Sequence, residues 1–126
     1  MPKKVVLVGH CGPDSSYLRI AISKASKDIQ ILSADDENEL SQILAQQPDL
    51  LLVNRELEFG FAERHGVKLI EMLSKQKPPV KMMLISNFPE AQQEAVKAGA
   101  VLGFGKREVG TPKVTEILQA VLQGPS

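Results

Sequence analysis

A chain of 126 residues has the length of one domain and is too short for two independent ones. Hydrophobic residues make up 43% and charged residues 24%, which argues against disorder, a collagen-like repeat or a coiled coil. Lys and Arg together number 15, as do Asp and Glu, so no net positive charge favours direct binding of nucleic acid or of an anionic membrane. No apolar run approaches the length of a membrane span or of a signal-peptide core. We therefore expect one cytoplasmic domain over residues 1–126, with 123–126 as a frayed tail.

Five short apolar segments recur along the chain and are predicted as strands. They cover Val5–Val8, Ile29–Leu32, Leu50–Val53, Met82–Ile85 and Val101–Phe104. Most of them are continuously apolar rather than alternating, which is typical of parallel strands that are buried on both faces.

Apolar residues between these segments recur at helical spacing and predict five helices. The stripes are Leu18, Ala21, Ile22 and Ala25; Leu40, Ile43 and Leu44; Val67, Ile70 and Leu73; Ala91, Ala95, Val96 and Ala98; and Val114, Ile117, Leu118 and Val121. Asp14 is predicted to cap the first helix, Asp36 and Glu39 to form a capping box, and Gly99 to close the fourth helix. Strict alternation of strand and helix predicts an α/β protein with three layers, whose ligands bind beyond the carboxyl ends of the strands.

The residues that follow the predicted strands resemble a known family. Pro48–Asn54, Leu84–Asn87, Lys97–Ala100 and Gly103–Lys106 are similar to the corresponding segments of response-regulator receiver domains, and the resemblance spans essentially the whole chain. It implies a flavodoxin-like (βα)5 sandwich, with a five-stranded parallel sheet in the order 2-1-3-4-5. It also implies a phospho-acceptor aspartate after the third strand and an acidic pair after the first strand that holds Mg²⁺.

Several positions depart from that family pattern. Ser86 and Lys106 match the family's hydroxyl residue and lysine, but Asn54 stands at the phospho-acceptor position. The acidic pair is replaced by His10-Cys11, or by Gly9-His10 if the register slips by one. Mg²⁺ prefers carboxylate oxygens and an amide is a poor nucleophile, so we expect no metal-assisted phosphoryl transfer. The side chains that remain, together with the amides of the first helix, predict an electropositive pocket that favours an anion.

The residues that report phosphorylation in the family are also altered. Gly103 stands where an aromatic residue usually lies, three positions before the lysine, and Phe104 is displaced by one. A displacement by one residue in a strand sends the ring to the opposite face of the sheet. Arg107 replaces the usual proline after the lysine.

Several residues have two interpretations. Lys106 is either a retained contact to an anion or partner, or forms an ion pair with Glu56 or Glu108. Cys11 is either a redox thiol or, as we expect, a buried or inert cysteine. The segment Glu58–Gly66, with its two phenylalanines, either contacts a partner or packs on the third strand.

The remaining acidic, histidine and cysteine residues are not expected to form a metal or catalytic site. Asp35, Asp36 and Glu37 are explained by helix capping. His10, Cys11 and His65 lack the spacing of a metal site, and no acid or serine stands at catalytic spacing from them, so neither a cofactor nor an enzyme is expected.

The sequence therefore predicts a receiver-like signalling domain that works without phosphorylation, through protein–protein contacts. The resemblance implies that these contacts use the face made by the fourth helix, fifth strand and fifth helix, and a homodimer is a further candidate. The alternative hypothesis is a sensor of a small anion or phosphorylated metabolite, which would be bound by Lys106, Ser86 and the first-helix amides.

Overall fold

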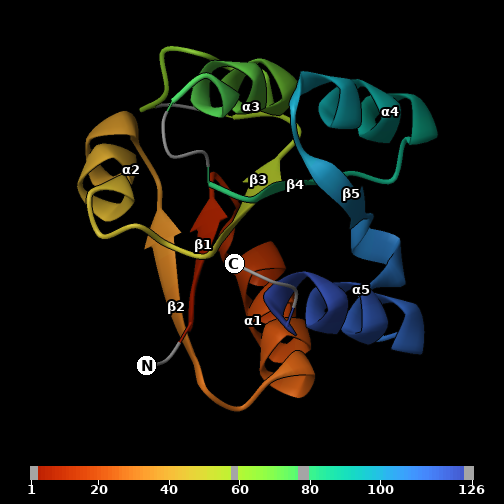
Figure 1. Ribbon diagram of the computed structural model, residues 1–126. Helices are drawn as coiled ribbons and strands as arrows, with labels where there is room; N and C mark the ends of the chain where they lie inside the picture. Colours follow the sequence, from red (N-terminus) through yellow and green to blue (C-terminus); the bar gives the residue numbers. More distant parts are fainter. Residues whose placement is uncertain (1–2, 58–59, 77–79, 124–126) are drawn as a thin grey trace.

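Five parallel strands form one sheet in the computed structural model, which describes residues 3–57, 60–76 and 80–123 (Figure 1). The strands are β1 (Lys3–Val8), β2 (Ile29–Ala34), β3 (Leu50–Asn54), β4 (Met82–Ile85) and β5 (Val101–Phe104). Their order in the sheet is β2-β1-β3-β4-β5. The predicted flavodoxin-like α/β fold and strand order are therefore confirmed.

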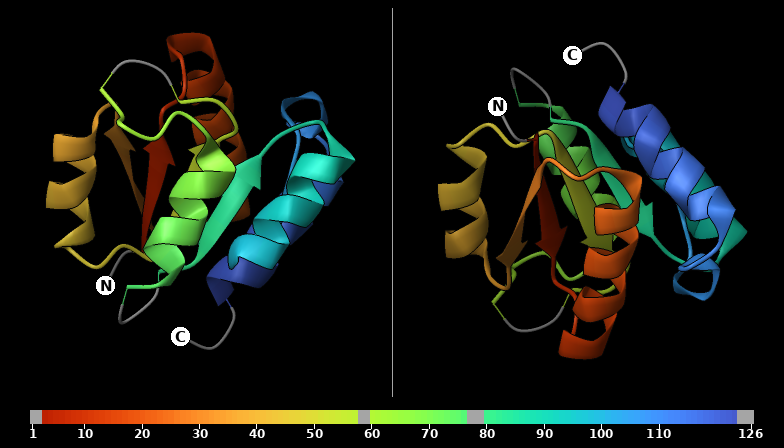
Figure 2. Two further views of the ribbon diagram at one scale, coloured as in Figure 1. Left: turned by 90° about the horizontal axis from the view of Figure 1, so that it is seen from above. Right: turned by 90° about the horizontal axis from the view of Figure 1, so that it is seen from below.

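Helices cover both faces of the sheet (Figure 2). They are α1 (Gly12–Ala25), α2 (Glu37–Leu44), α3 (Gly66–Ser74), α4 (Pro89–Ala98) and α5 (Pro112–Gln123), with a short 3₁₀ turn η1 (Lys106–Glu108) before α5. One hydrophobic core lies between the sheet and α1 and α5, and a second between the sheet and α2, α3 and α4. The inner strands β1, β3 and β4 are buried on both faces by these layers over most of their length, as their continuous apolar runs predicted, whereas the edge strands β2 and β5 are only partly buried.

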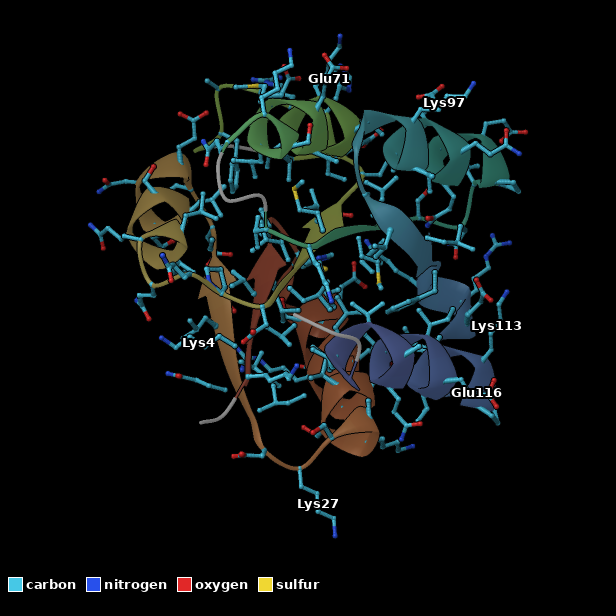
Figure 3. The ribbon with its side chains drawn as sticks, in the orientation of Figure 1. Lys4, Lys27, Glu71, Lys97, Lys113 and Glu116 are labelled. Atoms are coloured by element: carbon cyan, nitrogen blue, oxygen red, sulfur yellow. The ribbon has the colours of Figure 1, made fainter. Side chains whose placement is uncertain are left out.

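The predicted apolar stripes face these cores with one exception. All four stripe residues of α1 are buried, whereas Val96 of α4 is 45% exposed. In the described residues, charged side chains such as Lys27, Glu71 and Lys97 point away from the cores (Figure 3). No helix among the described segments combines the length and apolar character that a membrane crossing requires.

Two predicted helix ends need correction. Asp14 does not cap α1, because the helix already begins at Gly12 and Asp14 lies in its first turn. The frayed tail is predicted to begin at Gln123, but the helical backbone of α5 includes this residue and ends with it. Residues 124–126 lie outside the described part of the chain. Asp36 does cap α2, by accepting a hydrogen bond of 2.7 Å from the Glu39 amide.

The connection after β3 folds against the protein. Leu57 and Phe61 are buried in the core beneath α2 and α3, and Glu56 pairs with His65 in an isolated antiparallel bridge. A side chain at Gly9, whose φ is +72°, would collide with Leu57. Phe61 therefore packs inside, as one of the two interpretations held, while Phe59 lies outside the described residues.

Candidate functional site

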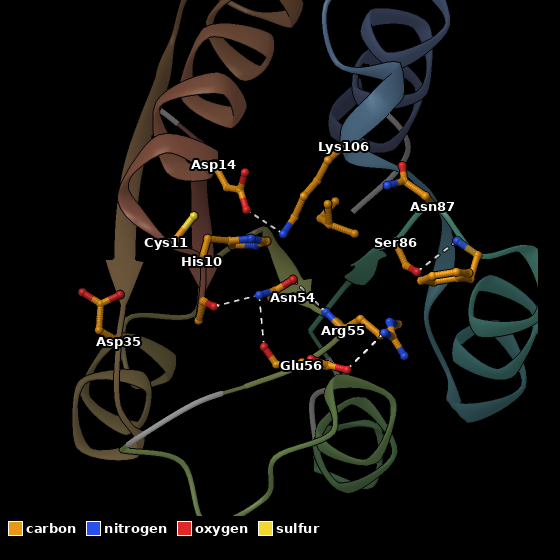
Figure 4. A pocket seen from close by; sticks show the side chains of 13 residues that line it. His10, Cys11, Asp14, Asp35, Asn54, Arg55, Glu56, Ser86, Asn87 and Lys106 are labelled. Atoms are coloured by element: carbon orange, nitrogen blue, oxygen red, sulfur yellow. Dashed lines mark hydrogen bonds and ion pairs between the residues drawn. The ribbon is translucent and has the colours of Figure 1, made fainter.

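A pocket of about 530 Å³ opens at the carboxyl ends of the strands (Figure 4). Right-handed crossovers bring the ends of β1, β3, β4 and β5 to this same edge of the sheet. The lining residues are Gly9, His10, Cys11, Asp14, Asp35, Asn54, Arg55, Glu56, Ile85, Ser86, Asn87, Phe88 and Lys106. All six residues predicted from the sequence as site positions are thus brought together at one edge of the sheet.

Asn54 is bonded entirely to backbone groups. Its amide nitrogen donates hydrogen bonds of 3.0 Å to the carbonyl oxygens of Gly9 and Glu56. Its amide oxygen accepts a 3.0 Å bond from the backbone N–H of Arg55. The side chain therefore ties the end of β1 to the loop after β3, and its NH₂ group fills the space between two carbonyl oxygens.

Lys106 forms an ion pair with Asp14, at 2.6 Å between Nζ and the carboxylate oxygen. This corrects both sequence-based alternatives for its partner, since Glu56 pairs with Arg55 and Glu108 with Lys113. The hydrogen bond from Lys106 holds the pKa of Asp14 below its ordinary value. Asp14 lies in the first turn of α1, so its carboxylate reaches across the pocket toward the end of β5.

His10 is buried beneath the pocket. Its Nε2 donates a 2.9 Å hydrogen bond to the carbonyl oxygen of Leu52, and its Nδ1 is buried with no hydrogen-bond partner among the described residues. Burial lowers the pKa of His10 to about 4, because the charged ring would lose its hydration. The imidazole is therefore neutral near pH 7 and adds no positive charge.

Cys11 is exposed and precedes the first residue of α1. The expectation was a buried or inert cysteine, and its exposure shows that the first half is wrong. The turn at Gly9 and His10 places residue 11 at the rim of the pocket rather than beneath it.

Ser86 follows β4 and is engaged by the residues just after it. Its hydroxyl oxygen accepts a 3.2 Å hydrogen bond from the backbone N–H of Phe88. The guanidinium group of Arg55 lies over the Phe88 ring, 4.8 Å from its centroid. A cation–π contact therefore links the loops after β3 and β4 at the rim of the pocket.

The charge of the pocket differs from the expectation. Beside the two cations Lys106 and Arg55, three carboxylates line it: Asp14, Asp35 and Glu56. The predicted electropositive pocket is therefore wrong, because both cations are paired with carboxylates. Asp35 was assigned to helix capping, but Asp36 alone of that cluster caps α2, and the carboxylate of Glu37 instead accepts a hydrogen bond from Ala62.

The residues present do not fit the Mg²⁺ ion that the resemblance to receiver domains implies. No group of three or more His, Cys, Asp or Glu side chains with suitable placement occurs in the described ranges 3–57, 60–76 and 80–123. At the position of the phospho-acceptor, Asn54 turns NH₂ hydrogens toward the Gly9 and Glu56 carbonyls. An N–H donor repels a cation, and hard cations prefer carboxylate oxygens.

Comparisons with known proteins show the fold. No family model and no curated protein matches the chain. Among solved structures, the receiver domain of the stress response regulator RcsB from Escherichia coli is 14% identical, with a TM-score of 0.77 over 100% of this chain and 97% of that one. The signal receiver domain of a DNA-binding response regulator from Colwellia psychrerythraea 34H is 12% identical, with a TM-score of 0.76 over 96% and 98%. The phosphorylated cyanobacterial phytochrome response regulator RcpA is 13% identical, with a TM-score of 0.70 over 98% and 93%. By its strand order, its layers and these likenesses, the chain has the fold of response-regulator receiver domains.

Proposed function

We propose that this chain is a receiver-like signalling domain that binds a protein partner without being phosphorylated. The observation that carries this proposal is that the polar side chains at the phosphorylation positions are engaged inside the protein. Asn54 bonds to three backbone groups, Lys106 pairs with Asp14, and Ser86 accepts from the Phe88 amide. A phosphoryl group would have to displace these contacts rather than complete an open site.

The chemistry of the site supports the same proposal. A carboxylate attacks phosphorus through a charged oxygen, whereas the Asn54 oxygen is neutral and already accepts the Arg55 N–H. None of Gly9, His10 and Cys11 offers a carboxylate for Mg²⁺. These positions therefore supply neither the nucleophile nor the ligands for the cation that would neutralise the transferred group.

The face made by α4, β5 and α5 is our candidate for the partner surface. Three large apolar side chains at its α4–β5 side are exposed: Phe88 by 54%, Val96 by 45% and Leu102 by 63%. Exposed aromatic and aliphatic side chains of this kind act as anchors in protein interfaces. The zero net charge of the chain favours a protein partner over nucleic acid, and a second copy of the chain in the cytoplasm is one such partner.

The test follows backbone amide NMR signals near Asn54, Ser86 and Lys106 while Mg²⁺ and then beryllofluoride are added. We expect no saturable shifts. In parallel, the wild type and Asn54→Asp are incubated with radiolabelled acetyl phosphate, and neither should retain label. Saturable shifts that spread into α4, or stoichiometric labelling of either the wild type or Asn54→Asp, would overturn the proposal.

A second candidate function is binding of a small anion or phosphorylated metabolite, supported by the open pocket and its two cations, Arg55 and Lys106. The anion would have to take Lys106 from Asp14. A thermal-shift series with inorganic phosphate and acetyl phosphate tests this candidate. A rise in melting temperature that Lys106→Ala abolishes would support it, and a flat series would remove it.

A further inference from the structure

A buried glutamine joins α4 to the ends of two strands. The side-chain nitrogen of Gln92 lies 2.9 Å from the carbonyl oxygen of Leu84, 3.1 Å from that of Ser86 and 3.3 Å from that of Phe104. Its side-chain oxygen accepts a 3.1 Å hydrogen bond from the backbone N–H of Gly103. One side chain thus satisfies groups of β4, of the loop after β4 and of β5.

Gly103 makes this arrangement possible. A Cβ atom at residue 103 would collide with the Leu84 carbonyl oxygen and lie 2.6 Å from a Met83 side-chain carbon. It would also lie 3.3 Å from the Gln92 side-chain oxygen. Phe104, the nearest aromatic residue, packs on the other face of the sheet with α1 and α5. The space between α4 and β5 is therefore filled by the amide of Gln92 rather than by a ring.

The apolar side chains by which α4 packs on the protein are small. Gln92 and Ala95 are its only buried residues, Ala91 and Ala98 are partly buried against the same core, and Val96 is exposed. By comparison, α1 buries Leu18, Ala21, Ile22 and Ala25. Burying three alanine methyl groups contributes less to the free energy of folding than burying the larger side chains of α1, so the hydrogen bonds of Gln92 carry a large share of the attachment.

We propose that Gln92 and Gly103 form a buried latch that fixes α4 on the ends of β4 and β5 and gives the α4–β5 surface one geometry. The latch also bonds the Ser86 carbonyl, so it holds the pocket loop and the exposed Val96 and Leu102 in a fixed relation. The surface is therefore ready for a partner without a signal from the pocket. This consequence for recognition rests on the proposed function, whereas the latch itself does not.

The experiment measures amide hydrogen exchange by NMR in the wild type, in Gln92→Met and in Gln93→Met. Gln93 is the matched control because it follows Gln92 on α4 and is exposed. In Gln92→Met, we expect the Gly103 amide and the α4 amides to exchange at least about tenfold faster, because the acceptor and donors of the latch are gone. Amides of α1 and α5 should stay within about twofold of the wild type. Wild-type exchange at Gly103 and α4 in a folded Gln92→Met would overturn the latch.

Gln92→Glu keeps the proposal testable if the methionine variant fails to fold. A glutamate at residue 92 can accept from Gly103, but its ionised form cannot donate to the three carbonyls. Protonation restores one donor, so its melting temperature should approach that of the wild type as the pH falls from about 7 to about 4. A difference that stays constant over this range would overturn the latch. Saturable beryllofluoride shifts would overturn the proposed function and leave these exchange results untouched.

Discussion

Replacing Asn54 by aspartate should weaken the fold, although the two side chains have nearly the same shape. The Asn54 nitrogen donates to the carbonyl oxygens of Gly9 and Glu56, both at 3.0 Å. An ionised carboxylate has no hydrogen to donate and would place a charged oxygen against those carbonyls. The amide oxygen's contact with the Arg55 N–H can survive the substitution.

The size of the effect follows from the two hydrogen bonds that the substitution removes. One internal hydrogen bond contributes about 0.5–1.5 kcal/mol net, so two give roughly 1–3 kcal/mol. We expect the free energy of unfolding to fall by about 2 kcal/mol at pH 7, which lowers the melting temperature by roughly 6–10 °C in a domain of this length. The two carbonyl oxygens beside the new carboxyl group disfavour its charged form and therefore raise its pKa. The penalty is therefore present above the ordinary aspartate pKa of about 3.9 and shrinks as the pH falls below the raised value.

Urea and thermal unfolding of wild type and Asn54→Asp at pH 7 and pH 4 provide the assay. Asn87→Asp is the matched control, because Asn87 lines the same pocket but its oxygen, which aspartate retains, accepts from the Arg107 N–H. The control should stay within about 0.5 kcal/mol of the wild type. If Asn54→Asp is as stable as the wild type at pH 7, the nitrogen of Asn54 does not tie Gly9 to Glu56.

Three further predictions concern the same edge of the sheet. Burial lowers the pKa of His10 to about 4, so the contribution of this residue to the free energy of unfolding should be complete above about pH 6.5. It should fall by up to about 3 kcal/mol as the pH decreases from about 6.5 to about 4 and level off below that, because the unfolded chain takes up the proton first. Urea unfolding measures this decrease, which His10→Asn should largely remove. The Lys106–Asp14 ion pair is partly exposed, so a double-mutant cycle with Lys106→Met and Asp14→Asn should give a coupling free energy of less than about 1 kcal/mol at pH 7. This coupling should decline once the pH falls below the ordinary Asp pKa, because protonation removes the carboxylate charge. A coupling of several kcal/mol would contradict this prediction. Gly103→Ala should lower the free energy of unfolding by roughly 1–3 kcal/mol through its collision with the Leu84 carbonyl, whereas Gly12→Ala, whose Cβ meets nothing within 4 Å, should leave thermal unfolding unchanged.

The strands and helices were predicted correctly because local sequence patterns indicate them. Continuous apolar runs and helical stripes depend on residues close together in the chain, so the layers could be predicted without coordinates. The predictions from the sequence were wrong for residues whose role depends on side chains that are distant in the chain but adjacent in the fold. Asp14 has the residue type of a helix cap, yet it pairs with Lys106; Asp35 has the same type, yet it lines the pocket. Val96 fits the apolar stripe of α4 but lies at its edge, because α4 is attached mainly through smaller residues.

The sequence analysis did not predict the buried role of Gln92. A glutamine within an amphipathic helix is ordinarily solvated. The feature that could have indicated its burial is the missing side chain at Gly103, which lies beyond the end of the helix. Only when β5 lies beside β4 does that absence become a space that a side chain from α4 can fill.

The alternation of strands and helices could be predicted from hydrophobic periodicity, and the side chains at the carboxyl ends of the strands could be predicted from right-handed crossovers. How those side chains are used depends on contacts that form only in the folded protein. Asn54 became a donor to two carbonyls, Lys106 the partner of Asp14, and Gln92 a buried link between α4 and the sheet. Hydrogen bonds and ion pairs act over a few ångströms, so their partners exist only after packing has brought distant segments together.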